Sequence, residues 1–238
     1  MKPDLYIDIG NSSIKTRWFT NGQWSVVDRW SPEQMDVLSR KAGDAGKVVI
    51  SAVSLKNYDL LASTLKTDSL LLDHHALADY IHYNTPETLG MDRVLATVGA
   101  WSLTGSPALV VDAGTAITID QVSSKGVFLG GVIMPGIAVL ERSLRQNTDL
   151  PAVDRRLPDH WPPKSTEEAL QWGLTGSVKA AVQAHIQKFR ESDSDASIFM
   201  TGGDGQWLAD ITGLNVRVEP DLVFIGMKYV ADMMNNSD

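Results

Sequence analysis

Hydrophobic and polar positions along the first hundred residues form short apolar or alternating runs separated by turn signals, a pattern typical of an α/β protein. The chain opens with three predicted strands, at 5–9, 14–19 and 24–29, and the Asn21-Gly22 turn signal separates the last two. We interpret these strands as an antiparallel meander. The next predicted elements are a helix from Pro32 to Lys41 with Ser31 as its N-cap, a strand at 47–51, a helix at 57–65, a strand at 69–73 and a helix at 91–103.

The second half of the chain repeats this plan. Three strands are predicted at 108–112, 116–121 and 126–133, followed by a helix from Pro135 to Asn147, with the proline in its first turn. Residues 149–164 are rich in proline and predict a loop or flap. The remaining predictions are a long helix from Ser165 to Phe189, weakened or kinked by Gly173 and Gly176, a strand at 197–201, a helix at 206–211, a strand at 215–219 and a helix at 222–233.

The order of meander, helix, strand, helix and strand is that of a ribonuclease-H-like domain, and the chain contains it twice. Thr104-Gly-Ser-Pro107 interrupts the helical pattern between the two copies. A chain of 238 residues is long enough for two domains of ordinary size. We therefore predict an α/β fold of two ribonuclease-H-like domains, residues 1–105 and 106–238.

A motif recurs at the same point of both predicted domains. Leu5-Tyr-Ile-Asp-Ile-Gly-Asn-Ser12 and Leu109-Val-Val-Asp-Ala-Gly-Thr-Ala116 each join a buried strand to Asp, one further residue, Gly and a short polar residue. The strand fixes the carboxylate, and the glycine lets backbone N–H groups approach an anion closely. Either copy alone is more often an ordinary turn, since Asp, Gly and Asn are common turn formers. The recurrence of the motif favours a binding site for phosphate and a cation.

Two further segments carry candidate chemistry. Gly90-Met-Asp-Arg93 opens the helix at 91–103, where Asp92 is either a solvated cap or a base for a hydroxyl group, with Arg93 as a clamp for an anionic acceptor. Thr201-Gly-Gly-Asp-Gly205 lies between a predicted strand and helix. That turn is either plain architecture or a flat backbone surface for a nucleoside.

Composition narrows the classes of function. With 43% hydrophobic and 21% charged residues, the chain can bury a sizeable core. A formal net charge of −8 argues against nucleic acid or an anionic membrane as the main partner, so we expect small ligands. No cysteine is present, which excludes disulfides and thiolate metal sites. We expect a cytoplasmic protein, because no apolar run reaches the ~18 residues of a membrane helix and the N-terminus lacks a signal-peptide pattern.

Taken in order, these motifs resemble those of the type III pantothenate kinases. The resemblance spans residues 6 to about 205 and rests on Asp8-x-Gly-Asn-Ser12 with Lys15, Gly90-x-Asp-Arg93, Asp112-x-Gly-Thr-Ala116, Gly130-Gly-x-Ile-x-Pro-Gly136 and Thr201-Gly-Gly203. It implies the fold of the acetate and sugar kinase, Hsp70 and actin superfamily, in which two ribonuclease-H-like domains close over ATP in a central cleft. It also implies transfer of phosphate from ATP to pantothenate, giving 4′-phosphopantothenate, the committed step toward coenzyme A.

The resemblance assigns roles to particular residues. Asp92 matches the general base, and Asp112 matches the ligand of a monovalent cation, potassium or ammonium. Asp8 is the expected neighbour of magnesium bound with ATP, and the family implies a homodimer. The ATP contacts implied by the match are Asp8, Ile9, Gly10, Asn11, Ser12, Ser13, Ile14, Lys15 and Thr115. The pantothenate contacts implied are Tyr83, Gly90, Met91, Asp92, Arg93 and Thr166.

Two rival functions remain at this level. One is a regulator without catalytic activity on the same scaffold, similar to accessory transcription factors described among relatives of the family. Such a regulator would be free to lose Asp92, Arg93 or Asp112, and this chain has all three. The other is a different small-molecule kinase or ATPase of the superfamily, against which the Gly90-to-Arg93 motif argues.

Overall fold

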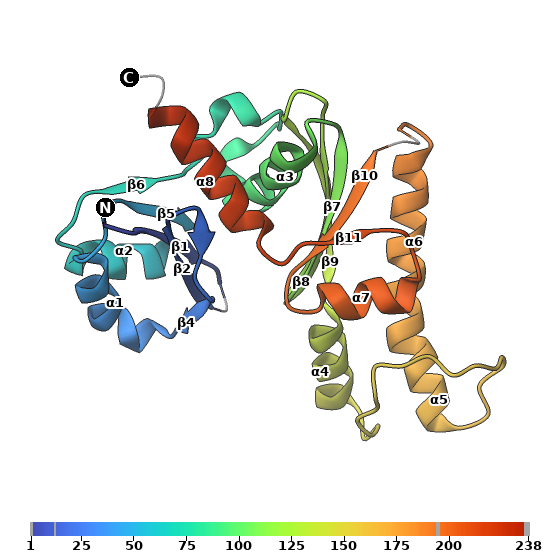
Figure 1. Cartoon of the computed structure of the whole chain (residues 1–238). Helices are drawn as coiled ribbons and strands as arrows, with labels where there is room; N and C mark the ends of the chain where they lie inside the picture. Colours follow the sequence, from blue (N-terminus) through green and yellow to red (C-terminus); the bar gives the residue numbers. More distant parts are fainter. Residues whose placement is uncertain (1, 12, 194–195, 236–238) are drawn as a thin grey trace. The chain divides into compact units, whose positions relative to one another are not determined.

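The computed structural model describes residues 2–11, 13–193 and 196–235, which divide into two compact units (Figure 1). Unit 1 holds the described residues up to Gly105, the segment Val122–Leu129 and those from Asp221 onward. Unit 2 holds Ser106–Gln121 and Gly130–Pro220. The domains predicted from sequence, 1–105 and 106–238, stay a prediction. The compact units differ from them because Phe128 and the C-terminal helix pack into the core of unit 1.

Unit 1 is built on a mixed sheet of order β3-β2-β1-β5-β6, with β4 also pairing with β2. The central strand β1 is antiparallel to β2 and parallel to β5. Short 3₁₀ turns lie before α1, at Pro32–Gln34, and before α3, at Ala78–Tyr80 and Pro86–Thr88. The strands are β1 (Asp4–Ile9), β2 (Ile14–Thr20), β3 (Gln23–Trp24), β4 (Asp28–Trp30), β5 (Val48–Ala52) and β6 (Ser69–Leu71), and the helices are α1 (Met35–Ala42), α2 (Leu55–Thr64), α3 (Met91–Thr104) and α8 (Leu222–Asn235).

Both faces of this sheet are covered, and alternation along β1 divides the side chains between them. Leu5, Ile7 and Ile9 pack in one apolar cluster with residues of α1 and α2. Tyr6 points the other way, into a second cluster with residues of α3 and α8. Asp8 shares the side of Tyr6 because the two positions are two residues apart. The Asp8 carboxylate therefore lies on the face that α3 covers.

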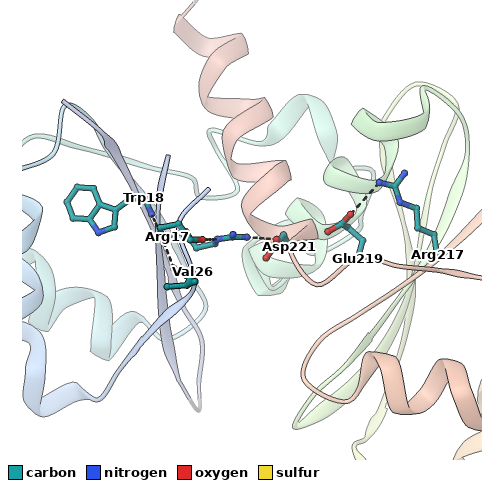
Figure 2. Close-up of polar contacts among 7 residues, drawn as sticks. Arg17, Trp18, Val26, Arg217, Glu219 and Asp221 are labelled. Atoms are coloured by element: carbon teal, nitrogen blue, oxygen red, sulfur yellow. Dashed lines mark hydrogen bonds and ion pairs between the residues drawn. The ribbon is translucent and has the colours of Figure 1, made fainter. Parts of the chain in front are cut away.

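Helix α8 packs against α3 at a crossing of two glycines. A Cβ added to Gly99 would lie 2.2 Å from the Leu222 carbonyl oxygen, and one added to Gly226 would lie 1.9 Å from the Leu95 carbonyl oxygen. The two helix backbones are thus in direct contact. The start of α8 is also tied to β2, since Arg17 forms an ion pair with Asp221 in unit 1 (Figure 2).

Unit 2 is built on a five-stranded sheet of order β11-β10-β7-β8-β9, in which β10 runs parallel to β7 and β11. Its core joins apolar residues of β7, β8 and β10 to those of α4, α6 and α7. The strands are β7 (Ala108–Ala113), β8 (Ala116–Val122), β9 (Phe128–Pro135), β10 (Ser197–Thr201) and β11 (Arg217–Val218). The helices are α4 (Ile137–Asn147), α5 (Thr166–Gln171), a π-helical turn (Trp172–Gly176), α6 (Ser177–Arg190) and α7 (Gly205–Thr212).

Most predicted elements are confirmed, with three local corrections. The strand predicted at 24–29 is two short strands, β3 and β4, which both pair with β2. Pro135 does not open a helix: it ends β9, and α4 begins at Ile137 with Gly136 as N-cap. The weakness predicted at Gly173 and Gly176 takes the form of the π-helical turn between α5 and α6. Within the described ranges, no helix is long and apolar enough to cross a bilayer.

Candidate active site

The first candidate element is the hairpin between β1 and β2. Asp8 and Lys15 are partners across the two strands, and the Lys15 Nζ lies 4.0 Å from the Asp8 Oδ2. The Asp8 side chain is buried, whereas that of Lys15 is about one-third exposed. Gly10 closes the turn by donating its N–H to the Ser13 carbonyl oxygen at 3.0 Å, and a Cβ on Gly10 would lie 3.1 Å from that oxygen. The hairpin presents a cation and backbone groups beside a buried carboxylate.

The other residues predicted for this hairpin fall into two groups. Ile9 and Ile14 are buried and anchor the ends of the strands in the core, so only their backbone is left to meet a ligand. Asn11 is exposed at the turn. Ser12 lies outside the described residues.

The second candidate element is the N-terminus of α3. Gly90 is the N-cap, and a Cβ there would lie 2.6 Å from the Asp92 Oδ1, so the glycine leaves room for this carboxylate. The Arg93 backbone N–H donates to the same oxygen at 2.9 Å. Met91 is buried in the core of unit 1, which leaves only its backbone for substrate. The start of the helix thereby holds one carboxylate in a defined position.

Burial raises the pKa of Asp92 above its ordinary value of 3.8. The hydrogen bond and charge of Arg93 and the charge of Lys15 oppose this effect on the pKa. Lys15 therefore acts electrostatically on Asp92. Within unit 1, the β1–β2 hairpin and the start of α3 lie close enough for their charges to interact. A carboxyl group with a raised pKa near a cation is typical of a general base.

Arg93 and Tyr83 meet on a phenylalanine that the sequence analysis did not single out. The Arg93 guanidinium carbon lies 5.4 Å from the centroid of the Phe128 ring, and Arg93 itself is buried. The Tyr83 ring contacts Phe128 edge to face at 5.8 Å. Phe128 is fully buried at the start of β9 and no polar motif marks it, so no sequence signal distinguishes it from other core residues. It holds the two predicted pantothenate contacts together.

The third candidate element is the turn between β7 and β8 in unit 2. Gly202, in the turn after β10, has a φ of +87°, and a Cβ there would lie 2.3 Å from the Asp112 Oδ1 and 2.4 Å from the Ala113 carbonyl oxygen. The Asp204 N–H donates to that Ala113 oxygen at 2.9 Å. The Asp112 carboxylate oxygen and the Ala113 carbonyl oxygen therefore lie close together beside this glycine. Oxygen atoms in such an arrangement are suitable ligands for a monovalent cation such as potassium or ammonium.

Thr115 is exposed at the tip of the same turn. Its carbonyl oxygen accepts the N–H of Gly136 at 3.0 Å, which ties the turn to the start of α4. Thr166, the predicted later substrate contact, is exposed at the start of α5, where Ser165 caps the helix by accepting the Glu168 N–H at 3.2 Å. Asp112, Thr115 and Thr166 are thus all residues of unit 2.

No group of three or more histidines and carboxylates able to hold a metal ion occurs in residues 2–11, 13–193 or 196–235. Asp8 and Asp112 are single carboxylates, in different units. A cation at either one would complete its ligands with backbone oxygens, water or the phosphates of a bound nucleotide.

Comparison with known proteins identifies the family. The type III pantothenate kinase family profile matches residues 4–188. The chain is 31% identical to a type III pantothenate kinase of Porphyromonas gingivalis strain W83, over 98% of this chain and 99% of that protein. The chain belongs to the type III pantothenate kinase family.

Solved structures agree on the fold of this type III pantothenate kinase. A protein of Campylobacter jejuni described as a putative Baf family transcriptional activator matches with a TM-score of 0.70 and 23% identity, covering 98% of this chain and 99% of that one. MreB5 of Spiroplasma citri, bound to AMPPNP, matches with a TM-score of 0.57 and 9% identity over 100% of this chain and 98% of that one. The kinase therefore has the α/β fold of the actin-like ATPases.

Proposed function

We propose that this protein transfers the γ-phosphoryl group of ATP to the primary hydroxyl of pantothenate, which gives 4′-phosphopantothenate and opens coenzyme A biosynthesis. The observation that carries the proposal is the position of Asp92. Its carboxylate lies at the start of α3, its pKa is raised by burial, and Lys15 of the phosphate hairpin acts on it. Membership of the family supplies the acceptor, because related proteins of similar length are type III pantothenate kinases.

In this mechanism Asp92 is the general base. Its carboxylate takes the proton of the pantothenate hydroxyl as that oxygen forms a bond to the γ-phosphorus, and the bond between the γ-phosphorus and the oxygen of the leaving ADP breaks. Arg93 and Tyr83, which share a contact on Phe128, bind and orient the anionic acceptor. Gly90 and the Met91 backbone line the same pocket, and Thr166 adds a later contact.

ATP is bound by the hairpin residues from Asp8 to Lys15, with Thr115 as a second contact. Gly10 keeps the backbone of the turn open to phosphate, and Lys15 offsets the charge on the group being transferred. Asp8 would hold Mg²⁺ that arrives with ATP, and Asp112 would hold a monovalent cation, K⁺ or NH₄⁺. These ions supply positive charge that stabilises the phosphates in the transition state.

We also propose that the enzyme is a cytoplasmic homodimer, as the family resemblance implies. Its small-molecule partners are ATP and pantothenate, and its net charge of −8 disfavours a nucleic acid or an anionic membrane. Light scattering after size-exclusion chromatography gives the mass directly. A mass near twice 26.0 kDa supports the dimer, and a mass near that value contradicts it.

The test of the proposed function is ADP release by the purified protein. The assay contains MgATP with and without pantothenate, in potassium and then in sodium buffer. Release that depends on both pantothenate and potassium supports the substrate, the reaction and the cation. A folded protein that binds ATP yet releases no ADP under any of these conditions overturns the proposal in favour of the regulator. Release without pantothenate points instead to another ATPase of the superfamily.

A further inference from the structure

A polar row crosses three neighbouring strands of the sheet in unit 1. Strands β2, β1 and β5 are neighbours in this sheet (Figure 1). Asp8 of β1 is paired with Lys15 of β2 on one side and with Ser51 of β5 on the other. Side chains at such partner positions lie on the same face of a sheet and within reach of each other. Ser51 is therefore the direct neighbour of the candidate phosphate-loop carboxylate, opposite Lys15.

The face on which Ser51 lies is the functional one. Val49, two residues earlier on β5, packs in the same apolar cluster as Tyr6 and residues of α3. Because side chains alternate along a strand, Ser51 and Asp8 share that face. Asp92 lies in the first turn of α3, the helix that covers this face. The serine hydroxyl is thus enclosed on the side of the sheet that carries the proposed chemistry.

Ser51 carries a buried hydroxyl that contributes no hydrogen bond to the fold of the described residues. Its side chain has no exposed surface, and its Oγ has no hydrogen-bond partner among the residues that the structure describes. Leaving a buried hydroxyl without a partner is unfavourable, and an alanine would avoid that cost. Other buried hydroxyls of unit 1 are satisfied: Ser39 donates to the Thr64 carbonyl oxygen at 2.6 Å and Thr97 to that of Val94 at 2.8 Å.

We propose that Ser51 is a positioning residue of the nucleotide site. When MgATP binds, its Oγ–H donates a hydrogen bond to the Asp8 carboxylate and fixes that group toward the phosphate hairpin. This inference rests on the proposed function, because it assigns Asp8 to the ATP site. The hydrogen bond that Ser51 lacks in the ligand-free protein then forms when MgATP binds. Unsatisfied buried polar groups of this kind often mark functional sites.

The test compares Ser51→Ala with Ser39→Ala, which removes an equally small buried hydroxyl that already has a partner. The measurements are the melting temperature without ligand, the affinity for MgATP by calorimetry, and the KM for each substrate. Ser51→Ala is expected to melt at or above the wild-type temperature, to bind MgATP about tenfold more weakly and to keep its KM for pantothenate. Ser39→Ala is expected to melt lower and to bind MgATP normally. Ser51→Thr keeps the hydroxyl. If this variant melts like the wild type, it is expected to bind MgATP with wild-type affinity.

Two outcomes overturn the proposal. Ser51→Ala with normal MgATP affinity shows that the hydroxyl does not act on the site. Ser51→Ala that melts clearly lower than the wild type shows that the hydroxyl is already satisfied in the ligand-free protein, which removes the premise of the proposal. Calorimetric binding separates this inference from the proposed function, since wild-type protein that binds MgATP without phosphorylating pantothenate removes the kinase assignment and leaves the Ser51 comparison intact.

Discussion

At the residue scale, Asp92 combines two opposing influences on one carboxyl group. Burial raises its pKa, while Arg93 and Lys15 lower it, and the rise prevails. A base of this kind must lose its proton before it can act. With Asp92 as the proposed base, we expect its environment to set the acid side of the pH range in which the enzyme works.

The first prediction is a pH profile. As the pH falls through the raised pKa of Asp92, kcat should fall with it, so the acid limb lies above the pH expected of an ordinary aspartate with a pKa of 3.8. Lys15→Gln removes a charge that lowers this pKa, and the limb should move to still higher pH. Steady-state assays at saturating ATP and pantothenate measure both. A limb that lies at the ordinary value, or moves the other way in Lys15→Gln, contradicts the role of Asp92.

The second prediction concerns stability at the same residue. A carboxyl whose pKa is higher in the folded than in the unfolded protein contributes stability below its unfolded pKa and loses that contribution as the pH rises through the folded value. At neutral pH the buried charge of Asp92 therefore lowers the free energy of unfolding. Asp92→Asn should unfold at equal or higher denaturant concentration at pH 7, with the difference shrinking toward acid pH. Denaturation curves that show it less stable at pH 7 contradict this.

At the element scale, the crossing of α3 and α8 holds the helix that carries Asp92. The third prediction is that Gly226→Ala destabilises the protein by about 1–3 kcal/mol or more, because its Cβ would lie 1.9 Å from the Leu95 carbonyl oxygen. Gly173→Ala is the matched control, since apart from its chain neighbours and its own helix backbone no described atom would lie within 4 Å of the added Cβ, and alanine favours helix. Thermal unfolding measures both. Equal effects of the two substitutions would show that the crossing is not tightly packed.

Arg155 anchors the proline-rich segment that joins α4 to α5. Its Nε and Nη2 donate to the two carboxylate oxygens of Glu141 at 2.9 and 2.8 Å, and its Nη1 donates to the Asp204 Oδ1 at 3.1 Å. The Trp207 Nε1–H donates to the Arg155 carbonyl oxygen at 2.9 Å. One residue thus connects α4, the turn after β10 and α7.

The fourth prediction is that Arg155→Gln frees this segment, whereas Arg156→Gln does not. The Arg156 side chain is 70% exposed, and its nearest carboxylate in the described part of the chain, that of Glu167, lies 3.8 Å away, so its ion pairs contribute little stability. A partly exposed bidentate pair contributes about 1 kcal/mol. Limited proteolysis between residues 148 and 165 should be faster in Arg155→Gln alone. Equal cleavage rates in both variants would contradict the anchoring role.

At the scale of the whole molecule, the sequence predicted the order of elements because each strand and helix carries its own periodicity and turn residues. The β-hairpins at Asp8 and Asp112 were predicted because a strand-like run follows each Asp-x-Gly motif. Contacts between distant segments carry no such signal. Phe128 joins the core of unit 1 from the start of β9, and Ser51 lies beside Asp8 only because β5 pairs with β1. Pairing of this kind is decided by tertiary packing, which local patterns do not encode.

The whole protein should also respond to its nucleotide. A ligand that binds only the folded state stabilises it by about 2.7 kcal/mol at a concentration 100 times its Kd. MgATP is therefore expected to raise the melting temperature. An unchanged melting temperature at millimolar MgATP contradicts nucleotide binding.

The most direct measurement is the amount of 4′-phosphopantothenate that the wild-type protein and Asp92→Asn form from MgATP and pantothenate, followed by mass spectrometry. We expect steady product formation by the wild type and a rate lower by about 10²–10⁴ in a folded Asp92→Asn that still binds MgATP. Equal rates in the two proteins would remove Asp92 from the role of base. No product from folded, ATP-binding wild type would contradict the kinase activity itself.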